Sequence, residues 1–432
     1  MKWNYHRIVI MKSFINNKII HTAVILFALS CCYPLFAQGG PGRYPLKTLI
    51  TRSLEKHAGI ASQSSRIQEY RELEKHVQRW ENPSLGLELG KKTAEGESGT
   101  VYGLSLSQII SLPGKKEIMS GIARLEANKA ALGLDELKLF IRYEVVRLSY
   151  EYMIIYERTR HMRERLGRLR LVNSYMQGRL LVSPQKIVEK SIIQSRIAIL
   201  EKELAGVKTS LKTAFSKLNI YASLKDVQPP EIELSWFRKS PPVSRDDFME
   251  GAMKNSFLLR VQQTELAAAE KNAALAGAQV YPDIGISVFY QKDTTDAGER
   301  TIGGGVSFPV PLLSQNRHAV RQHEARFKSE ELMLRHLRNT VKEQMKGLFA
   351  RYEYAASMLE KFPLAMMNTL EQSMRYADRE FRRGRVQMVT YLEMDTQTHE
   401  MVESIYESQM ELVRVYTALL FSAAMDREVN GN

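Results

Sequence analysis

The chain has 432 residues, of which 44% are hydrophobic and 25% charged, a composition that excludes wholesale disorder and collagen-like repetition. Lysine and arginine number 61 against 48 acidic residues, which gives a formal charge of +13. Residues 1–37 hold four of these basic residues and no acid, so the remainder carries +9. This is mildly basic for its size, and we expect no nucleic-acid partner.

Residues 1–37 are predicted to be a signal peptide. A basic segment precedes an apolar run at 23–30, and a cleavage site follows Ala37. The run is shorter than the about 20 residues that a membrane-spanning helix needs. Both cysteines, Cys31 and Cys32, lie in this segment, so cleavage leaves a mature chain without a thiol. Two alternatives stay open: a start at Met11 and a lipid anchor on Cys31.

An internal repeat organises the rest of the chain. Three segments recur about 200 residues later: 83–87 (PSLGL) at 282–286 (PDIGI), 103–106 (GLSL) at 305–308 (GVSF), and 175–179 (YMQGR) at 381–385 (FRRGR). We therefore expect two tandem copies of one unit, at 38–228 and 245–432. The proline-rich linker at 229–244 separates them, because its prolines cannot continue a helix.

Each copy contains one predicted β-hairpin, at 82–112 and at 281–313. Leucines at 85, 87 and 89 alternate with Gly86, Glu88 and Gly90, and the second hairpin alternates in the same way. Each strand has about ten residues, enough for a tilted crossing of an outer membrane. An ordinary hairpin packed on helices is the alternative that this pattern leaves open.

The remaining sequence predicts long helices. Apolar residues from Leu134 to Ile155 recur at helical spacing, and we expect one helix from Lys115 to Gly178 with a length of roughly 95 Å. A sustained apolar seam follows in the returning helix, which indicates coiled-coil packing: Ile193, Ile197, Leu200, Leu204, Val207, Leu211, Ala214 and Leu218. Helices at 48–81 and 246–280 lead into the hairpins, and Pro363 is expected to interrupt the second outgoing helix. Each copy is thus a rod with strands at one end and a helical turn at the other.

Four amphipathic strands cannot close a barrel, and open edges in a bilayer cost several kcal/mol for each unpaired backbone group. Strands that enter a membrane must therefore be shared by several chains: two chains give eight strands, and three give twelve with room for passage. The residues that we expect to face inward are small or polar, which favours the open lumen. They are Gly86, Glu88, Gly103, Ser105, Gly285, Ser287, Gly305 and Ser307.

The sequence resembles the TolC-like outer-membrane efflux proteins. The resemblance rests on Tyr281-Pro282-Asp283-Ile284, on the strand at 305–312 followed by Asn316-Arg317, and on the order and doubling of the two glycine-centred turns. It implies a mainly α fold: a long coiled-coil helical barrel, plus four strands per chain in a trimeric, 12-stranded transmembrane β-barrel. The segment at 107–116 is most similar to the heavy-metal efflux branch.

The resemblance also implies partners and a location. It implies a homotrimer in outer-membrane lipid, with a periplasmic tunnel whose tip meets a periplasmic adaptor protein and an inner-membrane pump of the RND type. The cargo would be metal ions, drugs or other small toxicants. Two alternatives stay open: the channel of a type I protein secretion system, and a secreted periplasmic coiled-coil scaffold or adhesin.

The two tips hold the candidate adaptor and gate residues. Gly178 and Gly384 are predicted where the rods fold back, since glycine supplies conformations that other residues resist. Arginines surround both turns, with Arg165, Arg168, Arg170 and Arg179 near the first and Arg379, Arg382, Arg383 and Arg385 near the second. They offer forked hydrogen bonds to an adaptor, or form a solvated basic surface.

An acidic residue nine positions after the second tip glycine constricts the entrance in similar channels, and Glu393 stands there, with Asp395 close by. Three copies of Glu393 around one axis would attract cations and repel each other. No phosphate loop, metal-protease motif or nucleophile elbow is recognisable in the sequence. We expect no enzymatic activity, no cofactor and no metal site.

Overall fold

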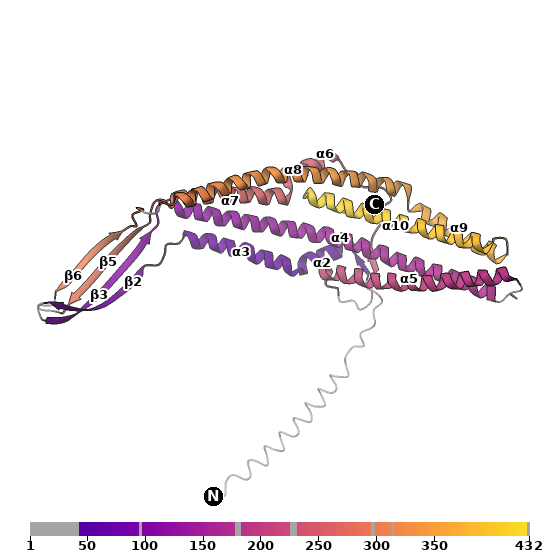
Figure 1. Cartoon of the computed structure of the whole chain (residues 1–432), viewed down its shortest axis with the longest axis horizontal. Helices are drawn as coiled ribbons and strands as arrows, with labels where there is room; N and C mark the ends of the chain where they lie inside the picture. The colour runs from indigo at the N-terminus through magenta and orange to yellow at the C-terminus, as the bar shows by residue number, and fades with distance from the viewer. Residues whose placement is uncertain are drawn as a thin grey trace, which may run out of the picture. The chain divides into compact units, whose positions relative to one another are not determined.

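The computed structural model describes residues 43–94, 97–177, 183–224, 231–294, 299–312 and 315–429 (Figure 1). The predicted signal peptide lies outside these ranges. The chain divides into two units, of which the smaller comprises Met1–Tyr44 and Lys225–Glu231. In that unit Arg43 and Glu231 form an ion pair of 3.1 Å; they belong to the short strands β1 (Arg43–Pro45) and β4 (Glu231–Glu233). All further description concerns the larger unit.

The helices of the first copy follow the predicted order. They are α2 (Leu46–Lys56), α3 (Ala58–Gln78), α4 (Lys115–Gln177) and α5 (Pro184–Ala222). Helix α4 is continuous over 63 residues, about 95 Å at 1.5 Å per residue. Both α3 and α5 pack on it, α3 near the strands and α5 at the other end (Figure 1).

The single helix predicted at 48–81 is wrong, because the chain breaks at His57. This residue has extended backbone angles (φ −71°, ψ 114°), and its ring nitrogen Nδ1 accepts a hydrogen bond from the Gly59 N–H at 3.2 Å. The imidazole therefore caps α3, which a periodicity pattern does not reveal. The helix predicted at 246–280 is also interrupted, at Ser256, 199 residues later, but the Ser256 side chain makes no capping hydrogen bond.

The helices of the second copy are α6 (Arg245–Asn255), α7 (Phe257–Ala278), α8 (Arg317–Lys361), α9 (Ala365–Arg382) and α10 (Met388–Ser422). The predicted interruption at Pro363 is confirmed, because it lies between the end of α8 and the start of α9. Proline lacks the N–H needed to continue the helical ladder. The outgoing rod is thus broken here, whereas α4 is not.

Four strands form one antiparallel sheet in the order β2-β3-β5-β6. Their bounds are β2 (Ser84–Ala94), β3 (Glu97–Ile110), β5 (Ile284–Asp293) and β6 (Arg300–Ser307). Each predicted hairpin forms, and β3 pairs with β5 to join the two copies, with Leu104 opposite Tyr290. Strands β2 and β6 lie at the edges of the sheet.

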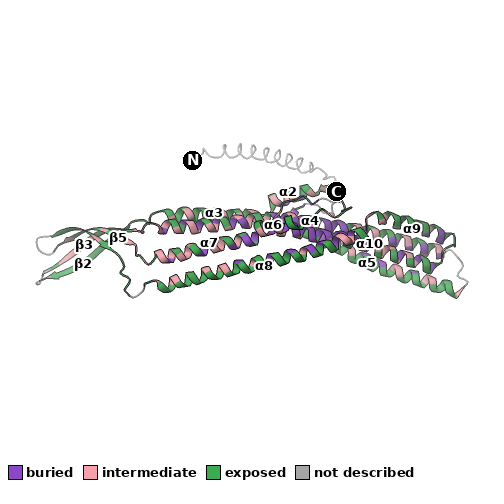
Figure 2. Ribbon diagram, turned by 90° about the horizontal axis from the view of Figure 1, so that it is seen from above, coloured by how far each residue is buried: buried purple, intermediate pink, exposed green. Residues whose placement is uncertain are grey.

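The helices lie side by side in two sets of four. Near the strands the order is α3-α4-α7-α8, and at the far end it is α5-α4-α10-α9 (Figures 1 and 2). The apolar seam predicted for α5 is buried at Ile193, Leu200, Leu204 and Leu218. The main core lies in the middle of the rod, where the linker residue Phe237 packs on Tyr150.

Candidate functional site

The sheet brings all eight predicted lumen residues to one face. Directly opposed residues of antiparallel strands share a face, and the register opposes three pairs of one glycine and one serine within the hairpins. These pairs are Gly86 with Ser105, Gly285 with Ser307, and Ser287 with Gly305. Glu88 opposes Gly103, and Ser287 also opposes Ser107. The eight residues therefore form one continuous small and polar surface.

The other face of the sheet is apolar and exposed. Leu87 is 77% exposed and Ile302 is 83% exposed, at opposite edges of the sheet. Leu104 and Tyr290 lie between them in the same cross-strand row. Leu85, Leu106, Val288 and Val306 extend this surface. An apolar surface of this kind marks contact with a membrane or another protein.

The small face is built by glycines opposite larger neighbours. A Cβ added to Gly86 or to Gly285 would lie 2.5 Å from the Oγ of its opposing serine. Larger apolar residues also lie on this face, among them Ile109 opposite Gly285 and Phe289, whose ring covers Gly303, where an added Cβ would meet Cζ at 2.5 Å. The aromatic ring shields a glycine that would otherwise weaken the strand. It also narrows the space in front of this face.

A buried lysine fixes the junction between the sheet and the helices. Lys115, the first residue of α4, is 7% exposed, and its Nζ donates to Asp283 Oδ1 at 2.8 Å and to the Tyr281 carbonyl at 2.6 Å. The Leu112 N–H donates to the same Asp283 oxygen at 3.3 Å. These bonds tie the start of α4 to the start of the second hairpin. They set the position of the sheet relative to the rod.

The second tip has the geometry predicted for its glycine. Gly384 has φ +76°, and the N–H of Arg385 donates to the Glu380 carbonyl at 2.9 Å. The Gly384 N–H donates to the Phe381 carbonyl at 2.9 Å, which completes a Schellman motif that ends α9. Gly178 and Arg179, the corresponding residues of the first tip, lie outside the described residues.

The arginines of the second tip are held by one buried carboxylate. Glu380 is 6% exposed, and its two oxygens accept hydrogen bonds from Arg383 at 2.9 Å and from Arg385 at 3.2 Å. The two guanidinium groups are themselves largely exposed. Tyr175 at the end of α4 donates to the Arg382 carbonyl at 2.6 Å, which connects α4 to this turn.

The two predicted gate carboxylates lie in different environments. Glu393 is exposed, and it accepts a hydrogen bond from Gln397 at 2.9 Å on its own helix. Asp395 is 1% exposed and pairs with Arg165 at 2.6 Å and with Arg168 at 3.6 Å. Glu393 is open to solvent, whereas Asp395 joins α10 to α4 within this chain.

The predicted surface role of Arg165 is wrong. This residue is 2% exposed and lies about 18 Å before the end of α4, so it is not part of the tip surface. Arg168 is also partly covered, because it reaches toward the same carboxylate. Arg165 and Arg168 lie three residues apart, so both are on the side of α4 that faces α10. The number of arginines near the tip does not indicate which of them are buried. The buried pair stabilises the contact between the two copies.

Two histidines that the sequence reasoning did not combine lie next to this pair. His161 of α4 and His399 of α10 stack with ring centroids 5.5 Å apart and planes inclined by 8°. Burial, the neighbouring ring and Arg168 lower the pKa of His161 to about 3. Burial and Arg165 lower the pKa of His399 to about 4. Both rings are therefore neutral at physiological pH.

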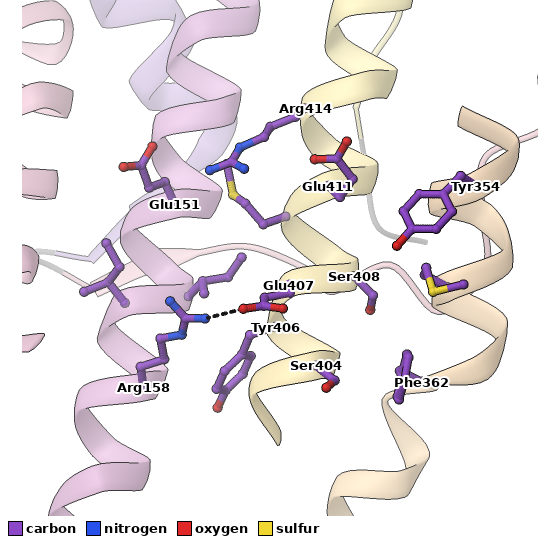
Figure 3. A pocket seen from close by; sticks show the side chains of 14 residues that line it. Glu151, Arg158, Tyr354, Phe362, Ser404, Tyr406, Glu407, Ser408, Glu411 and Arg414 are labelled. Atoms are coloured by element: carbon purple, nitrogen blue, oxygen red, sulfur yellow. Dashed lines mark ion pairs between the residues drawn. The ribbon is translucent and has the colours of Figure 1, made fainter. Parts of the chain in front are cut away.

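A cavity of about 610 Å³ lies where α8 ends, between α4, α8 and α10 (Figure 3). Arg158 from α4 reaches across it to Glu407 at 4.0 Å and pairs with Glu403 at 2.5 Å. Burial raises the pKa of Glu403 above its ordinary value, although Arg158 opposes the shift. Tyr354 and Phe362 close the α8 side (Figure 3).

No helix among the described residues is both long enough and apolar enough to span a bilayer. The same residues include no group of three or more histidine, cysteine, aspartate or glutamate side chains placed to hold a metal ion.

Comparison with known proteins confirms the resemblance found in the sequence. Residues 249–414 match the family described as outer membrane efflux protein. No curated protein matches the chain by sequence.

Solved structures establish the fold over nearly the whole length. VceC from Vibrio cholerae is 15% identical, with a TM-score of 0.67, over 89% of this chain and 97% of that one. MtrE from Neisseria gonorrhoeae is 12% identical, with a TM-score of 0.66, over 90% of each chain. A membrane protein from Pseudomonas aeruginosa is 13% identical, with a TM-score of 0.72, over 88% of this chain and 90% of that one. The fold is that of the TolC-like channels.

Proposed function

We propose that this chain, which matches the outer membrane efflux proteins over residues 249–414, forms a passive trimeric channel across the outer membrane. Its helices extend into the periplasm as a tunnel, and its strands form the membrane barrel. The observation that carries the proposal is the two-faced sheet with open edges at β2 and β6. The apolar face would contact lipid, and the small face with Glu88 would line the passage.

The sheet requires other copies of the chain. A bilayer offers no hydrogen bonds to the free backbone groups of β2 and β6, and four strands are too few to close on themselves. Three copies supply twelve strands, so that β2 of one protomer pairs with β6 of the next. Twelve strands enclose an open lumen, which eight do not. The small side chains on the inner face keep that lumen open.

The helices offer matching edges for the same assembly. Helices α5 and α9 lie at the two edges of the tip half. Four apolar side chains on α5 are between 44% and 58% exposed: Ile187, Val188, Ile192 and Ile199. Contact with α9 of the next protomer would bury this stripe by coiled-coil packing. The helical tunnel would then close with the same symmetry as the barrel.

The tip is the surface for partner proteins in this proposal. Arg383 and Arg385 present exposed guanidinium groups in a fixed geometry set by Glu380. Forked donors of this type suit the helix ends and carboxylates of a periplasmic adaptor. The adaptor would link the channel to an inner-membrane pump, and that pump would supply the energy. The cargo would be metal ions, drugs or other small toxicants.

Cross-linking between strand edges tests the assembly. Glu88 on β2 and Thr301 on β6 share one cross-strand row, so within one protomer they lie about 14 Å apart. We expect a chain with cysteine at both positions to give dimers and trimers with a short cross-linker in outer membranes. A matched chain with both cysteines moved to the exposed residues Lys208 and Lys212 of α5 controls for random collision. If the chain with cysteines on β2 and β6 gives only monomer after cross-linking, the proposal is contradicted.

A deletion strain tests the transport role. Removal of the channel is expected to increase sensitivity to metal salts or amphipathic drugs, and the wild-type gene restores resistance. Normal resistance together with the loss of one secreted protein from the medium would contradict efflux and favour protein export.

A further inference from the structure

A groove with uncompensated positive charge lies where the helices meet the sheet. We call it the junction groove; it has a volume of about 640 Å³ and runs between the end of α3, the first turns of α4 and one residue of α7. Its cationic residues are Lys116 and Arg124 of α4 and Lys271 of α7, and it also contains Glu117, whose carboxylate accepts a hydrogen bond from the Gly114 N–H at 2.9 Å. All three helices have their strand-side ends here (Figure 1). The groove is therefore next to the part of the chain that carries the apolar sheet.

Two of the three cations have no carboxylate partner among the described residues. Arg124 pairs with Glu74 at 2.7 Å. Lys116 donates to the Arg79 carbonyl at 2.9 Å, which leaves its charge uncompensated. Lys271 is partly buried and lies against Gly121, where an added Cβ would be 3.2 Å from its Nζ. A partly buried ammonium group without an anion is costly, so this arrangement favours an external anion.

An exposed tryptophan stands at the rim of the junction groove. Trp80 is 61% exposed, and Lys116 Nζ lies 4.0 Å from the centre of its ring. The apolar face of the sheet begins five residues later, at Leu85, a distance of about 16 Å along an extended chain. Tryptophan and lysine concentrate at the headgroup level of membranes, where an indole meets both water and lipid. With the sheet inserted in a membrane as proposed above, the groove would lie at the depth of the lipid headgroups.

We propose that the junction groove binds the phosphate of an anionic lipid headgroup in the periplasmic leaflet. Lys271 and Lys116 would donate to the phosphate oxygens, and Trp80 would contact the glycerol and the first carbons of the acyl chains. The inference rests on the proposed membrane insertion of the sheet. An anionic headgroup such as phosphatidylglycerol fits better than phosphatidylcholine, because a choline cation would restore the positive charge that the phosphate removes.

The test uses the purified full-length trimer in detergent, with lipid binding followed by native mass spectrometry. Dioleoyl phosphatidylglycerol and dioleoyl phosphatidylcholine are titrated separately into delipidated protein. We expect the wild type to retain phosphatidylglycerol preferentially. The variant Lys116→Gln/Lys271→Gln should bind it about 10- to 30-fold more weakly, since each lysine near a membrane surface attracts anionic lipid. Glutamine removes the charge, keeps a polar end and is only one bond shorter than lysine, so the groove should keep its shape.

The matched control is Lys208→Gln/Lys212→Gln, which removes two exposed lysines of α5 in the other half of the rod and should bind like the wild type. Unchanged phosphatidylglycerol binding by the groove variant, or equal binding of both lipids by the wild type, would overturn the inference. Inorganic phosphate that competes as well as phosphatidylglycerol would also overturn it, because the source of the phosphate would then be soluble.

A second variant and a second measurement guard against misfolding. If the double variant does not assemble, Lys271→Gln alone is compared with Lys208→Gln by the same titration. The thermal unfolding temperature is recorded with and without phosphatidylglycerol, and the lipid should raise it in the wild type and less in Lys271→Gln. A membrane-inserted trimer without lipid preference would refute this inference alone, whereas a chain that never inserts would refute the proposed function.

Discussion

The sheet differs from the tip half of the helical rod, which consists of α5, α9, α10 and the far end of α4, in how its apolar and charged groups are buried. The tip half buries its own apolar and charged groups, with Leu169 and Tyr391 fully covered and Asp395 paired with Arg165 inside one protomer. The sheet leaves Leu87, Leu104 and Ile302 exposed on one face and leaves both of its edges unpaired. Each region contains elements from both tandem copies.

This difference indicates which contacts each region lacks within a single chain. The tip half needs neighbours only along the edges of its helix layer, because its core is already formed between α4, α5, α9 and α10. The sheet has no core within its own chain, and in the proposed assembly lipid and other protomers supply one. Substitutions in the tip half should therefore affect the stability of the fold, and substitutions in the sheet should affect insertion and assembly.

The largest effect on stability is expected at the buried ion pair. Asp395→Ala leaves the Arg165 guanidinium buried without its partner, which should cost about 3–5 kcal/mol of unfolding free energy. Chemical denaturation in detergent measures it. Glu393→Ala, two residues away and exposed, should change the stability by less than about 0.5 kcal/mol. Equal stability of the two variants would show that the burial of Asp395 does not matter.

The next effect concerns insertion. Leu87→Arg places a charge on the apolar face, which should cost about 2–4 kcal/mol at the middle of a bilayer and reduce the trimer in outer membranes. Glu88→Arg on the same strand faces the small side and should insert normally. Membrane fractionation with unheated gel electrophoresis measures the amount of trimer. If both variants insert equally, the assignment of the two faces is wrong.

A smaller effect should follow from the histidine pair. His161 and His399 have pKa values lowered to about 3 and about 4, so below pH 6.5 the unfolded chain binds more protons than the folded one. Stability should fall as the pH drops from 6.5 toward 4, by about 1–2 kcal/mol at pH 5 after solvent screening. Unfolding temperatures across this range measure the effect. The variant His161→Gln/His399→Gln should show a flatter profile, and an unchanged slope would contradict this account.

Glycine at the second tip should have a still smaller effect. Gly384→Ala places a Cβ at φ +76°, which should cost about 1 kcal/mol although no neighbouring atom lies within 4 Å. Gly347→Ala in the exposed interior of α8 should stabilise by about 0.5–1 kcal/mol, because alanine favours the helix. Opposite signs of the two shifts in unfolding temperature are expected. A stabilising Gly384→Ala would contradict the assigned turn.

The smallest stability effect, with a change in function instead, is expected for the exposed tip residues. Glu393→Ala combined with Arg385→Ala should change the unfolding free energy by no more than about 1 kcal/mol, because Glu380 loses one arginine partner but keeps Arg383. The double variant should raise the single-channel conductance in planar bilayers, because it removes the proposed ring of Glu393 carboxylates and the Arg385 side chains at the entrance. Unchanged conductance would remove Glu393 from the gate.

Much of the fold could be predicted from the sequence, because periodicity and repetition are strong over long elements. The 63-residue α4, the break at Pro363 and the alternation of the strands all follow from residue spacing. The break at His57 could not be predicted, since it depends on a side-chain cap. The burial of Arg165 and Asp395 also could not, because it depends on which faces of α4 and α10 meet.

The candidate site was predictable to a similar degree. The small face of the sheet follows from alternation alone, and the register brings its eight predicted members together. The place of Phe289 over Gly303 requires the register between β5 and β6. The junction groove combines residues from α3, α4 and α7, which no local pattern connects.

The most direct test of the central claim is the native mass of the mature chain after extraction from outer membranes in mild detergent. The shared barrel predicts a complex of three chains, with bound lipid and no free monomer. A stable monomer in the membrane extract, or a chain recovered without detergent in the periplasmic fraction, would contradict it.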